Sequence, residues 1–104
     1  MNTDRIDGLD GRLTLILDPR LDLPAAGRLH AALLARTGTP LEIDATAVSH
    51  LGALCLQVLL AAARTWKKGG VSLVIRPRSA RFETALDTYG VSLDDLQSDP
   101  AEAE

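Results

Sequence analysis

The sequence predicts a small α/β domain in which a sheet of about four strands has helices packed against it. The length of 104 residues suits a single domain. Hydrophobic residues make up 46% of the chain and aromatic residues only 3%, so the core is expected to be aliphatic. Short strand-like segments alternate with longer helical patterns, which is typical of a sheet covered by helices.

Hydrophobic periodicity locates the elements. Leucines at every second position from Arg12 to Leu17 predict a strand. The Asp10-Gly11 pair before it is typical of a hairpin turn, which makes the preceding residues a weak first strand. The elements expected are strands at 6–9, 12–17, 41–43 and 71–75, and helices at about 24–36, 51–68 and 80–89.

Capping residues support the helix boundaries. Asp22 is a residue type that caps helix starts, with Pro24 in the first turn, and Ser79 has the same role before the last helix. Gly69-Gly70 and Gly90 are expected to end the second and third helices in the left-handed conformation.

The central helix, residues 51–68, carries most of the information. Its first half is apolar almost all round, which indicates burial on much of its circumference, and Trp66 continues the inward stripe. A second stripe holds only small or polar side chains: Ala53, Gln57, Ala61, Arg64 and Lys68. We expect this stripe to face solvent. Gly52 and Ala53 lack bulk, so a partner can approach the backbone there.

Composition argues against several function classes. The net charge is −3 and the basic residues are scattered, so nucleic acid is not an expected partner. The only cysteine, Cys55, cannot form an internal disulfide, which fits a reducing, cytoplasmic setting. No secretory signal is recognised, and the longest nearly apolar run, 51–63, is too short to insert across a membrane. No phosphate-binding glycine loop or metal-ligand cluster is found, so no cofactor and no metal are expected.

Two residues near the start of the central helix, His50 and Cys55, are of types that can take part in catalysis. His50 can act as a phosphoacceptor or general base, although a loop histidine is more often polar surface. Cys55 can act as a nucleophile near a helix start, but its leucine neighbours favour a small inert side chain. No Asp, Glu or Asn can be placed beside both residues, which argues against an enzyme. Asp44, at the end of a strand, is expected to cap the following turn.

The segment from Asp44 to Leu60, DATAVSHLGALCLQVLL, resembles the signature of STAS domains, the fold of anti-sigma factor antagonists. The matching positions are Asp44, Thr46, Val48 and Leu56, together with Arg20-Leu21-Asp22, Gly69-Gly70 and Gly90-Val91. The resemblance implies a STAS-like fold with a small mixed sheet. We expect residues 1–96 to form this domain. Residues 97–104, acidic and poor in apolar groups, are expected to be a disordered tail that is dispensable for stability.

The sequence departs from the family at its phosphorylation site. The phosphorylatable serine falls on Ala53, the preceding aspartate on Gly52, and the glycine after the serine pair on Cys55. Because alanine has no hydroxyl, the usual phosphoserine switch cannot operate at this degenerate position. Thr46 and Ser49 are nearby hydroxyls, but neither stands at the family's site.

The resemblance implies a non-enzymatic protein-binding module of bacterial signal transduction, in a sigma-factor or chemotaxis-type pathway. Its partner would be a signalling kinase or an anti-sigma factor. The implied binding residues are Thr46, His50, Gly52, Ala53, Leu54 and Gln57. Two alternatives stay open: a STAS subunit of a lipid-transport ATPase complex, and a small enzyme using Cys55 or His50. The oligomeric state is not predicted.

Overall fold

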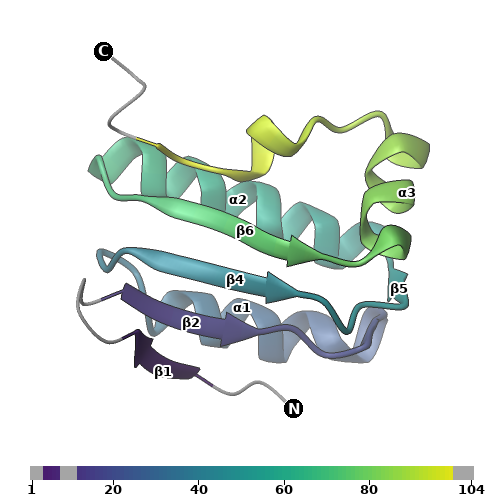
Figure 1. The fold of residues 1–104 in the computed structure, drawn as a ribbon, viewed down its shortest axis with the longest axis horizontal. Coiled ribbons are helices and arrows are strands. Elements are labelled where there is room, and N and C mark those ends of the chain that lie inside the picture. Colours follow the sequence, from purple (N-terminus) through teal and green to yellow (C-terminus); the bar gives the residue numbers. More distant parts are fainter. Residues whose placement is uncertain (1–3, 8–11, 100–104) are drawn as a thin grey trace.

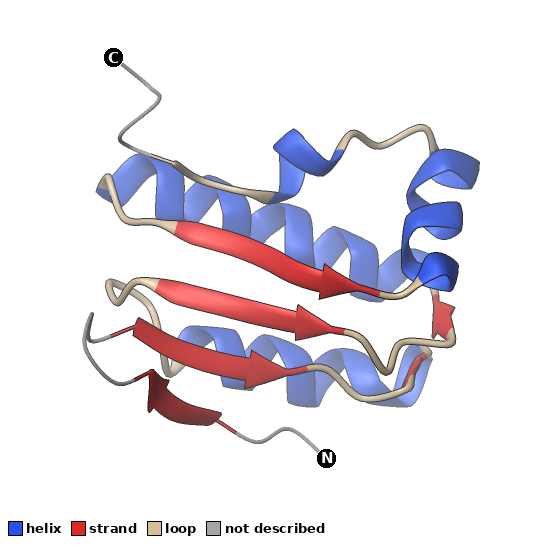
Figure 2. Ribbon diagram, viewed as in Figure 1, coloured by secondary structure: helices blue, strands red, loops and turns tan. Residues whose placement is uncertain are grey.

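The sheet has four strands and is covered on one face by two helices (Figure 1, Figure 2). The computed structural model describes residues 4–7 and 12–99. Along the sheet the order is β1 (Asp4–Asp7), β2 (Arg12–Ile16), β4 (Leu41–Ala45) and β6 (Leu73–Arg78). Strand β1 is antiparallel to β2, whereas β2, β4 and β6 are parallel. The predicted mixed α/β architecture is therefore confirmed.

The helices occupy two places around the sheet. α1 (Ala26–Leu34) and α2 (Ala53–Gly69) lie side by side behind it, and α3 (Ala80–Tyr89) stands at the end where β6 finishes (Figure 1). Two short 3₁₀ turns, Leu23–Ala25 and Leu93–Leu96, precede α1 and follow α3 respectively.

A second, two-stranded parallel sheet lies beside the carboxyl ends of the main strands. It pairs β3 (Arg20–Leu21) with β5 (His50–Leu51). The sequence did not predict it, because two-residue strands leave no periodic pattern. Residues 50 and 51 are thus strand and α2 begins at Ala53, two residues later than the predicted start.

The core fills the space between the sheet and its two helices. Leu15, Ile43 and Ile75 form one row across three adjacent strands, and each side chain is fully buried. From the helix side, Trp66 is buried and its indole N–H donates to the carbonyl of Thr39 at 2.8 Å. The inward stripe predicted for the central helix is confirmed.

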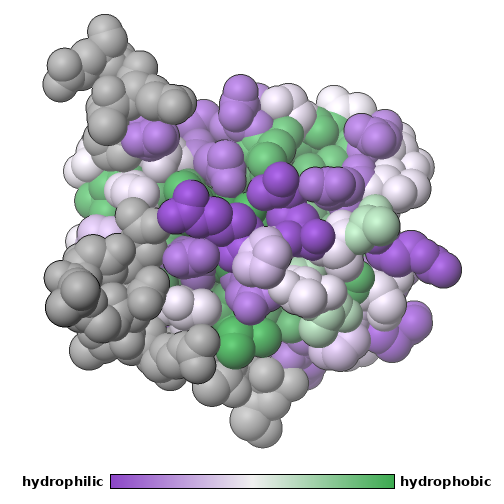
Figure 3. All heavy atoms as spheres, viewed as in Figure 1, coloured by the Kyte–Doolittle hydropathy of each residue, from purple (hydrophilic) through white to green (hydrophobic). Residues whose placement is uncertain are grey.

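The opposite face of the sheet carries no helix among the described residues and is polar. Figure 3 shows hydrophilic side chains gathered over the middle of this face. Glu42 and Arg76 form an ion pair across it, with 3.5 Å between Oε2 and Nε. The alternation of buried and part-exposed residues along β4 produces this one-sided sheet.

Most of the predicted caps are confirmed. Gly70 and Gly90 end α2 and α3 in the left-handed conformation, and the Ser79 hydroxyl caps α3. Asp22 occupies the N-cap position of the first 3₁₀ turn, as predicted, but its side chain makes no capping hydrogen bond, so the predicted side-chain cap is wrong. The predicted first strand at 6–9 appears at residues 4–7, and the Asp10-Gly11 turn lies outside the described residues.

The proposed boundary at residue 97 moves toward the C-terminus. Ser98 is buried, and its main chain exchanges two hydrogen bonds with Leu73 of β6, each 2.8 Å long. The side-chain oxygen of Gln97 accepts from the Ile75 N–H at 2.9 Å. Residues 97 and 98 therefore belong to the domain, although their polar composition suggested a tail. Residues 100–104 lie outside the described residues.

Candidate functional site at the start of α2

The loop that leads into α2 is fixed from one side by the chain before α1. The carbonyl of Pro19 accepts three hydrogen bonds: from the Ser49 N–H at 2.7 Å, the His50 N–H at 3.2 Å and the Ser49 hydroxyl at 3.1 Å. The Gly52 N–H donates to the carbonyl of Leu21 at 2.8 Å. These bonds join segments about 30 residues apart and set the position of the loop.

Helix α3 fixes the same loop from the other side. The Ser79 hydroxyl donates to the Val48 carbonyl at 2.6 Å, and the Ser79 N–H donates to the Ala45 carbonyl at 3.1 Å. The Tyr89 hydroxyl donates to the Leu51 carbonyl at 3.4 Å. The loop is thus held between two elements.

The first turn of the loop is closed by Asp44, as the sequence predicted. Its Oδ1 accepts from the Thr46 N–H at 2.9 Å, which is an Asx-type turn. Thr46 and Ser49 are both exposed, but only the Ser49 hydroxyl is engaged with a described backbone carbonyl. The structure therefore leaves Thr46 the more accessible of the two hydroxyls.

Gly52 allows the start of α2 to approach the β3 backbone closely. A Cβ on Gly52 would lie 3.1 Å from the Leu21 carbonyl oxygen and 3.7 Å from Nε2 of His50. The first of these distances is tighter than an ordinary van der Waals contact. Gly52 is also the N-cap of α2, and it provides no side chain to cap the first helical N–H groups.

The surface beside Gly52 is small and apolar. Ala53 and Gln57 are exposed, and with Ala61, Arg64 and Lys68 they form the solvent-facing stripe that the sequence predicted. Leu54, one of the predicted binding residues, is 44% exposed, whereas Cys55, Leu56 and Leu59 are buried, so the apolar first half of this helix is buried on much of its circumference but not all of it. Residue type alone therefore does not decide burial along this helix.

Leu23 is an additional exposed apolar residue that the sequence analysis missed. It is 72% exposed and directly follows Asp22, whose Cα would lie 3.9 Å from a Cβ on Gly52. A leucine near a predicted helix start gives no sequence signal for exposure, since leucines there usually pack inward. Of the six predicted binding residues, five are exposed and Gly52 is half-buried.

The two residues weighed for catalysis lie in different surroundings. Cys55 is buried, and its thiol donates to the Asp22 carbonyl at 3.4 Å. Burial raises the pKa of the Cys55 thiol, and the nearby Asp22 carboxylate raises it further, so the reactive thiolate is disfavoured. His50 is exposed. Among the described residues no three His, Cys, Asp or Glu side chains are grouped to hold a metal ion.

Across residues 4–7 and 12–99, no helix combines the length and apolar character needed to cross a bilayer.

Comparisons with known proteins agree with this fold. Residues 5–97 match the family model described as "Mlab, STAS domain". A similar solved structure is an anti-sigma factor antagonist from Mycobacterium paratuberculosis, with a TM-score of 0.63 and 26% sequence identity. The alignment covers 86% of this chain and 79% of that chain. No curated protein matches the sequence.

Proposed function

Because the chain belongs to the STAS domain family, we propose that it is a non-enzymatic regulatory module that binds a protein partner through the start of α2. The partner class we propose is a bacterial signalling kinase or an anti-sigma factor. The observation that carries the proposal is the exposed surface of Ala53, Leu54 and Gln57 beside Gly52, presented by a loop held on both sides.

The shape of this surface supports close contact with a partner backbone. Gly52 and Ala53 present no long side chains, while Leu54 and Leu23 supply apolar area beside them. A central apolar contact with a polar rim is the usual arrangement of a protein interface. The hydrogen bonds that the Pro19 and Leu21 carbonyls accept, and the one that the Ser79 hydroxyl donates, hold the surface in one conformation, which lowers the entropy lost on binding.

The proposed module has no phosphoserine switch at its helix start. Ala53 occupies the position of the family's serine, and a methyl group cannot accept phosphate. Association would then be controlled by the abundance or state of the partner.

The test is to place a charge in the proposed interface. A pull-down from the native cell identifies the bound protein, and calorimetry then measures its affinity for the wild type and for Ala53→Glu. The carboxylate lies in the first helical turn, where the helix dipole tolerates negative charge, so the fold should survive. In the complex it would be desolvated without a partner, and affinity should fall by about two orders of magnitude or more.

Ala61→Glu is the matched control. Ala61 is exposed on the same stripe but eight residues further along, about 12 Å along the helix axis. This variant should bind like the wild type. If Ala53→Glu keeps its circular dichroism spectrum and binds as tightly as the wild type, the partner face lies elsewhere.

A permanent subunit of a lipid-transport ATPase complex is the second candidate. The observation that favours it is the pair of exposed leucines, Leu23 and Leu54, because exposed apolar area near an interface suits stable association. Capture of an ATPase in fixed stoichiometry would support this function. Capture of a kinase or an anti-sigma factor would support the first.

A further inference from the structure

The outer edge of β6 is closed by the chain's own C-terminal segment. The Leu73 N–H and carbonyl exchange hydrogen bonds with the carbonyl and N–H of Ser98, in an antiparallel bridge. The Ile75 N–H donates to the Gln97 side chain, and the Ile75 carbonyl accepts from the Arg78 guanidinium at 2.6 Å. Each outward backbone group of Leu73 and Ile75 therefore has a partner from within the chain.

The next outward position on β6 is Pro77, which has no N–H to offer. Leu73 and Ile75 are thus the positions whose N–H groups would become available if the C-terminal segment left. An uncovered strand edge of this kind pairs readily with another strand.

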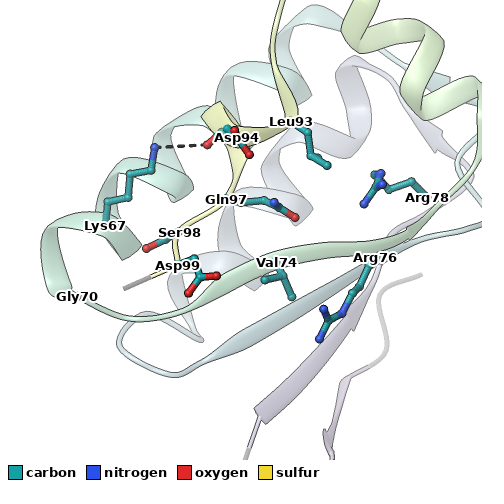
Figure 4. Close-up of a pocket in the computed structure, with 10 residues that line it drawn as sticks. All are labelled: Lys67, Gly70, Val74, Arg76, Arg78, Leu93, Asp94, Gln97, Ser98 and Asp99. Atoms are coloured by element: carbon teal, nitrogen blue, oxygen red, sulfur yellow. Dashed lines mark hydrogen bonds between the residues drawn. The ribbon is translucent and has the colours of Figure 1, made fainter. Parts of the chain in front are cut away.

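A hollow lies beside this edge. It has a volume of about 780 Å³ and runs along β6, lined by Val74, Arg76 and Arg78 on the strand side and by Leu93, Gln97 and Ser98 on the other (Figure 4). Its two arginines are paired, Arg76 with Glu42 and Arg78 with Glu83 at 3.0 Å, while Lys67 donates to the Asp94 carbonyl at 3.5 Å and the Asp94 and Asp99 side chains add negative charge to the lining. The hollow is therefore not built for a free anion.

The edge is complementary to itself. Because Ser98 already pairs in the antiparallel sense, a second β6 related by a two-fold axis would approach in the same sense. A pair centred on Val74 would set Leu73 against the second copy's Ile75, which are the two positions with outward backbone groups. Arg76 would face Ser72, so like charges would not oppose each other.

We propose that the β6 edge is a self-association surface held closed by residues 97–99, and that it pairs antiparallel with β6 of a second copy when this segment is displaced. The occupant is a second copy of this chain. The surface is separate from the start of α2, so the proposal does not depend on the proposed function.

Two truncated chains test the proposal. The chain ending at Leu96 loses the closing segment, whereas the chain ending at Asp99 keeps it and is the matched control. Light scattering over a concentration series should show the first approaching twice its monomer mass, while the second keeps the mass of the full chain. Val74→Lys in the shorter chain would place two ammonium groups at the two-fold centre and should restore the monomer.

A folded chain ending at Leu96 that keeps the full chain's mass at every concentration would overturn the proposal. If that chain does not fold, Ser98→Pro in the full chain removes the N–H that donates to Leu73, and it also replaces the buried hydroxyl by a ring. Gln97 has an extended backbone, φ −125° and ψ 159°, that tolerates a following proline. Hydrogen exchange at Leu73 and Ile75 should then quicken by about tenfold or more at low concentration, with slow exchange and doubled mass returning at high concentration. Unchanged exchange and mass would overturn the proposal.

Discussion

Helices α2 and α3 begin with nearly the same backbone geometry but with opposite chemistry. The N-cap residues are both extended: Gly52 has φ −85° and ψ 165°, and Ser79 has φ −74° and ψ 160°. Ser79 caps α3 by accepting from the Phe82 N–H at 3.0 Å, and Glu83 adds an acidic side chain in the first turn. Gly52 supplies no side-chain cap, and α2 has no acidic residue in its first turn.

This difference indicates a division of roles. A capping side chain contributes about 1 kcal/mol to stability, and α2 gives this up at a surface that stays free of polar bulk. The two starts are also connected, because the Ser79 hydroxyl bonds the Val48 carbonyl in the loop before α2. The capped helix start therefore helps to position the uncapped one.

If the start of α2 serves binding and not stability, α2 is stabilised by its buried side chains and not by its first turn. Leu59 is 2% exposed in the core, and Leu59→Ala should lower the free energy of unfolding by about 2–5 kcal/mol, the usual cost of emptying a leucine site. Urea denaturation measures the change. Gln57→Ala, on the exposed side of the same helix, should shift it by less than about 0.5 kcal/mol. Equal losses from both variants would contradict the orientation of the helix.

The next largest effect is expected at the capped start. Ser79→Ala removes the hydroxyl that accepts from Phe82 and donates to Val48, so the free energy of unfolding should fall by about 1–2 kcal/mol. Thermal or urea unfolding measures it, and Ser79→Thr, which keeps a hydroxyl, should recover most of the loss. An unchanged midpoint for Ser79→Ala would mean that the loop is held without α3.

The sequence predicted only part of the difference between the starts of α2 and α3. The cap at Ser79 and the stops at Gly70 and Gly90 were predicted because they depend on residue type and local backbone alone. The support from Pro19 was not, because a main-chain carbonyl 30 residues away leaves no pattern in side chains. The same reason explains Ser98, whose backbone pairs with β6 although its surroundings in sequence are polar.

The sequence predicted which face of α2 is exposed, but it did not predict all of the apolar surface beside it. The exposed stripe from Ala53 to Lys68 followed from helical spacing, and the departure from the family's serine could be read directly. The exposure of Leu23 and Leu54 depends on how the first 3₁₀ turn meets α2, which is a tertiary property. Leu54 was among the predicted binding residues, whereas Leu23 was missed.

Ala53→Ser is the variant with the smallest expected change in stability, and it tests directly whether the start of α2 lacks a phosphorylation switch. Ala53 is exposed, so Ala53→Ser should alter the free energy of unfolding by no more than about 0.5 kcal/mol. With a serine kinase that acts on STAS domains and ATP, the wild type should take no phosphate at the helix start, whereas Ala53→Ser should gain one group, measured by mass spectrometry. The added phosphate, about two negative charges, should then weaken partner binding as Ala53→Glu does. Stoichiometric phosphate on Thr46 or Ser49 of the wild type would contradict an unswitched module, and Thr46, whose side chain is exposed, is the residue to inspect first.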